Sequence, residues 1–124
     1  MAEVSGLAQF MVEIDTRWEN LKRTQAAGWM PPKDNPDLDP PHEALLLVEH
    51  YREAGRLPKI KQRPEQFRDM LTKTEEEAVR LEKALRLGKE MGKMDRAGAD
   101  EAFQRVKALC VQCHDKYRDV PQGK

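Results

Sequence analysis

Cysteine is scarce in this chain of 124 residues, which contains only two. Aromatic residues make up 6% of the sequence, and this argues against a sheet-rich fold, because strands favour aromatic and β-branched side chains. The 22 basic and 22 acidic residues leave no net charge, so nothing favours a nucleic acid or an anionic membrane surface as partner. No stretch approaches the roughly 20 apolar residues of a spanning helix. We therefore expect one domain over residues 1–124, without membrane insertion.

Helix-forming residues are plentiful instead, and apolar positions recur at spacings of three and four in several segments. Glycine and proline interrupt this pattern, the most extensive interruption being the Pro- and Asp-rich segment Gly28–Pro41, with a basic turn at Pro58–Lys61. The spacing predicts four helices, over residues 4–25, 40–55, 65–88 and 99–120. Because each helix has one apolar stripe to bury, we expect an all-α fold, an antiparallel up-down four-helix bundle.

The two cysteines lie together near the end of the last predicted helix, in the sequence Cys110-Val111-Gln112-Cys113-His114. Residues three and four apart share one side of a helical turn. Each thiol can then add to one vinyl group of a haem, while His114 projects from the same side and supplies an imidazole nitrogen to the iron. The motif thus predicts one covalent haem c, attached through Cys110 and Cys113 and ligated by His114.

Two other uses of a Cys-x-x-Cys pair have less support here. A redox dithiol is expected near a βαβ unit, not at the end of an all-helical chain. A structural zinc site needs a fourth ligand in addition to the two cysteines and His114. The two thiols that haem attachment requires are also the only two in the chain.

Several segments of the second half carry a family resemblance: RPEQFRD at 63–69, LEKA at 81–84, Ala102-Phe103, and CVQCHDKYR at 110–118. Together they resemble cytochrome c′, a class II cytochrome c whose fold is a four-helix bundle. The resemblance implies that His114 is the proximal iron ligand and that Arg118 lies beside the proximal imidazole and the haem edge. A solvated basic residue at a helix C-terminus is an equal alternative for Arg118. Relatives often form homodimers through the first two helices, so a homodimer is possible here.

The residue on the other face of the iron decides the function, because a second strong ligand gives an electron carrier and an open face accepts a small gas. In an up-down bundle the first half of helix one lies level with His114, and there Met11 is predicted to face inward. It is a candidate sixth ligand; otherwise Met11 fills the core or lines the distal pocket with Leu7. His50 is the rival ligand, although Leu47 and Tyr51 take the inward face, so that His50 is expected to be exposed.

These residues predict a haem c cytochrome that transfers single electrons outside the cytoplasm, with redox proteins as partners. The alternative is a five-coordinate cytochrome c′ that binds nitric oxide or another diatomic gas. We expect no enzyme, because turnover of peroxide needs distal acid-base groups and the inner face of helix one offers none. The first residues lack a secretory signal, so a periplasmic location implies that a leader was removed or replaced.

Overall fold

The computed structural model describes the backbone of residues 2–113 and the side chains of residues 9–112. Over this part of the chain it is all-helical and has no strand, as predicted. Five helices follow one another: α1 (Ala2–Ala26), α2 (Pro40–Gly55), α3 (Pro58–Lys61), α4 (Glu65–Met91) and α5 (Arg96–Cys113). None of these helices is long and apolar enough to cross a membrane.

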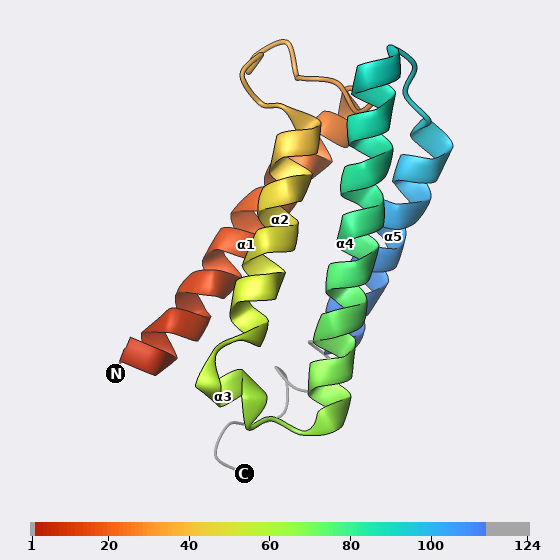
Figure 1. The fold of residues 1–124 in the computed structure, drawn as a ribbon. Helices are drawn as coiled ribbons and strands as arrows, with labels where there is room; N and C mark the ends of the chain where they lie inside the picture. Colours follow the sequence, from red (N-terminus) through yellow and green to blue (C-terminus); the bar gives the residue numbers. More distant parts are fainter. Residues whose placement is uncertain (1, 114–124) are drawn as a thin grey trace.

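The four long helices pack in chain order, α1 on α2, α2 on α4, and α4 on α5. Figure 1 shows the loop between α1 and α2 at one end of the bundle and α3 at the other. The first turns of α1 and α4 and the last turns of α2 and α5 share the end at which α3 lies (Figure 1). We call it the cysteine end, because α5 carries Cys110 and Cys113 toward it.

The expected end of the third helix at Gly88 is wrong. Gly88 is buried inside α4, where a Cβ would meet Met94 Sδ at 2.5 Å, so its role is to let Met94 approach the helix. The helix ends instead at Gly92, whose φ of 68° is the left-handed conformation typical of a helix C-terminus. A local rule for glycine does not distinguish these two roles, because the contact depends on the path of the α4–α5 turn, which contains Met94.

Two further helix boundaries differ from the sequence prediction. The basic turn at 58–61 is one turn of helix, α3, whose Ile60 is buried. The last helix begins at Arg96 rather than near residue 99, and Asp95 accepts a hydrogen bond from the Gly98 amide (3.0 Å). An acceptor just before the first turn satisfies an amide that lacks a partner within the helix.

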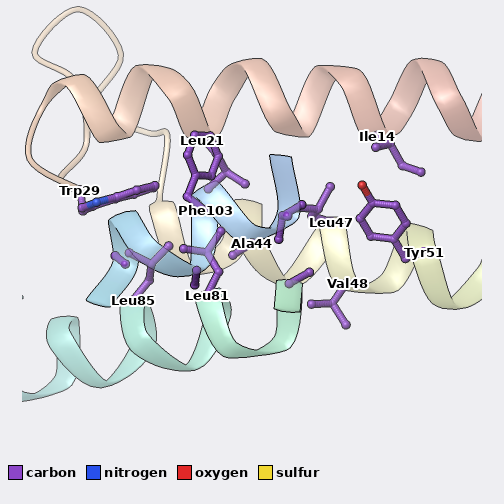
Figure 2. Close-up of a cluster of buried hydrophobic side chains, with 14 residues drawn as sticks. Ile14, Leu21, Trp29, Ala44, Leu47, Val48, Tyr51, Leu81, Leu85 and Phe103 are labelled. Atoms are coloured by element: carbon purple, nitrogen blue, oxygen red, sulfur yellow. The ribbon is translucent and has the colours of Figure 1, made fainter. Parts of the chain in front are cut away.

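An aromatic group fills the core toward the end opposite the cysteine end (Figure 2). Trp18 stacks on Phe103 with ring centroids 4.0 Å apart, and Trp29 meets Phe103 edge-on at 5.3 Å. Such pairs contribute about 0.5 to 1.5 kcal/mol each beyond the area they bury. The Nε1 of Trp29 donates to Asp100 Oδ1 (2.9 Å), so its polar edge is satisfied as well.

Trp29 belongs to the predicted loop segment Gly28–Pro41, yet it is fully buried in the core. Its placement follows from the end of α1, where Gly28 and Trp29 both have positive φ, 74° and 63°. The Trp29 amide donates to Thr24 O (2.7 Å) and the Gly28 amide to Gln25 O (3.0 Å), which is the Schellman arrangement of a helix C-terminus. This turn reverses the chain so that the indole enters the bundle.

A polar cluster holds α1 against α2. Arg17 Nη1 donates to both carboxylate oxygens of Glu43, at 2.9 and 3.2 Å, and Asn20 Nδ2 donates to Glu43 Oε1 at 3.0 Å. The Glu43 side chain is 7% exposed and that of Arg17 25%. Because a buried carboxylate needs charged or hydrogen-bonding partners, this cluster favours one register of α1 on α2.

Candidate functional site

The inner face of α5 carries Cys110. Phe103, Val106 and Cys110 follow one another at spacings of three and four, the first two are buried, and Cys110 is half-buried against the hydrophobic core. A helical stripe with this spacing faces its neighbours. The thiol of Cys110 therefore lies on the interior side of the helix, near its last turn.

A hydrogen bond across the bundle meets this thiol. The hydroxyl of Tyr51, on α2, lies 3.2 Å from Cys110 Sγ. Burial raises the pKa of the Cys110 thiol above its ordinary value, and the hydrogen bond with Tyr51 offsets part of that rise.

The other residues of the predicted attachment site cannot be placed in the same way. The backbone of α5 extends to Cys113, but the Cys113 side chain, His114 and Arg118 lie outside the described residues, as does the Leu7 side chain. In the described part of the chain, no group of three or more His, Cys, Asp or Glu residues is arranged to hold a metal ion. The Cys110 thiol, which lies on an apolar interior face, is suited to a thioether bond with a large apolar macrocycle such as a haem.

The family model for cytochrome C′ matches residues 48–118, more than half of the chain. The chain belongs to the cytochrome c′ family. No curated protein and no solved structure matches it at a significant level. The predicted resemblance to class II cytochromes c is therefore confirmed, and the matched region contains the whole Cys-x-x-Cys-His sequence. Membership in the cytochrome c′ family implies a covalently bound haem c and a role in electron transfer or gas binding.

Met11, the candidate sixth ligand of this cytochrome c′, lies on α1 one turn before Ile14. Helical spacing puts Met11 on the same face as Ile14 and Trp18, which contact the core. Ile14 is buried, but Met11 is 40% exposed. The expectation that Met11 faces inward is therefore wrong for this structure, and its role as a ligand stays a prediction.

The expectation that His50 is exposed is wrong. Its side chain is 20% exposed, and Nδ1 lies 3.5 Å from Glu13 Oε1 on α1. As predicted, Leu47 and Tyr51 are buried on the interior face of α2. His50 occupies the adjacent flank, which faces α1, and the carboxylate of Glu13 is its neighbour there.

Sequence reasoning treated Tyr51 only as part of an apolar stripe and missed its hydroxyl. Residues 51 and 110 are 59 positions apart, so no local pattern pairs them. Both were predicted to face inward, near the ends of helices two and four. In an up-down bundle, helices two and four finish at the same end. That shared end was the signal that could have identified the contact.

Proposed function

We propose that this cytochrome c′ family member is a single-electron carrier that works outside the cytoplasm with one haem c. In this proposal Cys110 and Cys113 hold the haem, His114 is the proximal iron ligand, and the described helices close around it as an antiparallel up-down bundle. The observation that carries the proposal is the interior Cys110 thiol, at the start of a Cys-x-x-Cys-His sequence within the family match. The haem supplies the redox chemistry, and the chain binds and orients the haem.

Met11 supports the carrier over the gas-binding alternative. Met11 lies on the same helical stripe of α1 as the buried Ile14, one turn before it, and its side chain is 40% exposed. Methionine with histidine is a known axial pair that raises the reduction potential of haem. Among the described α1 side chains on this stripe, Ile14 and Trp18 have no atom that could serve as an iron ligand in place of the Met11 sulfur.

Optical spectra test this assignment directly. The oxidised and reduced wild-type protein and the Met11→Ala variant are compared with and without nitric oxide. The control is Met30→Ala, because Met30 is an exposed methionine in the α1–α2 loop. A weak band near about 700 nm, lost in Met11→Ala and kept in the control, is the expected result for methionine ligation. High-spin spectra that neither substitution changes would refute the carrier and establish the gas-binding function.

The remaining parts of the proposal concern partners and location. Redox proteins, or a diatomic gas in the alternative, are the proposed partners, and members of the family are typically periplasmic.

We propose no enzymatic activity; steady-state oxidation of a dye by peroxide, at rates well above those of free haem, would contradict this. Val12 on α1 and Leu45 on α2 are exposed apolar side chains that support a homodimer through these helices. Sedimentation of the haem-loaded protein tests it.

A further inference from the structure

Tyr51 brings a polar group into the apolar cysteine end of the bundle. Its ring is buried, and its hydroxyl reaches Cys110 Sγ at 3.2 Å. Figure 2 shows the Tyr51 ring rising from α2 with its oxygen on the side of Ile14, in the space between α1 and α2. The hydroxyl thus lies inside the bundle, where a hydrogen bond is stronger than in water.

The position of this hydroxyl is set by the packing of α2 and does not depend on the cysteine. Tyr51 follows Leu47 by four residues and Val48 by three, and all three side chains are buried in the same core cluster. A tyrosine side chain has only two torsions to fix, and here the surrounding core fixes the ring. The core therefore fixes the Tyr51 hydroxyl oxygen at 3.2 Å from the Cys110 sulfur.

The donor and acceptor become fixed once Cys110 carries a haem. In the free chain either atom can donate, because both carry a hydrogen. A thioether sulfur has none, so only Tyr51 can then donate and Sγ only accepts. A Cys110 thioether would join the sulfur to a substituent carbon of the porphyrin, so a hydrogen bond from Tyr51 to that sulfur would bring the hydroxyl dipole near the haem.

We propose that Tyr51 is a positioning residue that holds the Cys110 thioether and raises the reduction potential of the attached haem. This proposal rests on the proposed function, since it requires haem on Cys110. Reduction adds one electron to the haem, supplied by the redox partner or mediator, and the positive end of an O–H dipole near the ring stabilises that electron. Hydrogen bonds from outside the ligand set are an established means by which proteins tune a haem.

The test compares midpoint potentials of haem-loaded wild-type protein and the Tyr51→Phe variant, which keeps the ring and removes only the hydroxyl. We expect the ratio of reduced to oxidised haem at a fixed potential to fall about three- to tenfold, the range of one net hydrogen bond. A tenfold change corresponds to a potential lower by about 59 mV for one electron. The control is Thr74→Val, because Thr74 is buried and its hydroxyl donates to Met70 O within α4 (2.7 Å).

The outcomes separate this proposal from the proposed function. Mass spectrometry of the wild-type chain comes first: a chain without covalent haem refutes the proposed function. With haem attached, an unchanged potential in Tyr51→Phe, or an equal shift in Thr74→Val, overturns the role of Tyr51 and leaves the haem assignment standing.

A second measurement needs no variant. After refolding in D₂O, the C–S stretching band of the thioether in the resonance Raman spectrum is expected to shift, because the donated hydrogen is exchanged. No shift would likewise overturn the proposal.

Discussion

Replacing Arg17 by methionine tests whether the polar cluster between α1 and α2 stabilises the bundle. The substitution keeps the length of the aliphatic stem and removes the charge and the hydrogen bonds to Glu43 at 2.9 and 3.2 Å. Glu43 is then a carboxylate, 7% exposed, with the Asn20 amide as its remaining partner in the cluster. Removing one member of a buried ion pair costs about 3 to 5 kcal/mol.

Two features of Arg17 reduce this cost. Its side chain is 25% exposed, so water screens part of the interaction. Its Nε is buried without a hydrogen-bond partner among the described residues, and losing that donor recovers about 1 kcal/mol. We expect Arg17→Met to lower the free energy of unfolding by about 2 to 3 kcal/mol.

Urea unfolding of the haem-loaded protein, followed by far-ultraviolet circular dichroism, measures this loss. With an m-value of about 1 to 3 kcal/mol/M, the midpoint falls by about 0.7 to 3 M urea. The matched control is Arg56→Met, since Arg56 contacts Glu53 at the same 2.9 Å but both side chains are more than half exposed. It is expected to change stability by no more than about 0.5 kcal/mol. Equal losses in the two variants would refute the argument that burial makes the Arg17 pair important.

Three further substitutions test the core, a close helix contact and the haem. Phe103→Ala is expected to cost about 3 to 5 kcal/mol in the same urea assay, because it removes a buried ring that contacts two tryptophans. Gly88→Ala is expected to cost about 1 to 2 kcal/mol in that assay although alanine favours helix, because its Cβ would lie 2.5 Å from Met94 Sδ. The double variant Cys110→Ala, Cys113→Ala is expected to be poorly ordered, with a broad thermal transition by circular dichroism, because the haem contributes a large apolar surface to the core.

Each of these expectations has an outcome that contradicts it. A loss below about 1 kcal/mol for Phe103→Ala would mean that the aromatic group adds little. A gain of stability for Gly88→Ala would show that helix propensity outweighs the contact; Gly55→Ala is its control, because a Cβ there meets only Leu71, at 3.9 Å, and fits. A cooperative, native-like melt of the double cysteine variant would show that the helices fold without haem.

Helix periodicity predicted the all-α architecture because the apolar stripes of the long helices are strongly periodic. Ile14, Leu47, Leu81 and Val106, one from each, are all buried in one cluster. Boundaries were less accurate, as Gly88 shows: glycine ends a helix or permits a close approach, and here the path of the following turn, which brings Met94 against Gly88, decides which. The burial of Trp29 was missed for a similar reason, since it depends on a turn whose residues both have positive φ.

The site was predictable where its chemistry is local and was missed where its partners come from distant segments. The Cys-x-x-Cys-His sequence predicts the attachment residues from local spacing alone, because the chemistry requires that spacing within one turn; this assignment stays a prediction. The contact of Tyr51 with Cys110 and that of His50 with Glu13 depend on the register of neighbouring helices. A shift of α2 by one residue would turn each side chain by about 100°, so periodicity alone does not specify which pairs meet.

The two ends of the bundle thus have different roles: one stabilises the fold, and the other contains the residues near the predicted haem. Toward the loop end, the stack of Trp18 on Phe103 and the Arg17–Glu43 pair fix α1. Toward the cysteine end, the groups that bear on the haem are placed by side chains already buried for other reasons, as Tyr51 is by its stripe on α2. Substitutions in the first group should therefore change the free energy of unfolding with little effect on the haem spectrum or potential. Tyr51→Phe should do the opposite, because it leaves the packed ring in place and removes only the dipole beside the sulfur.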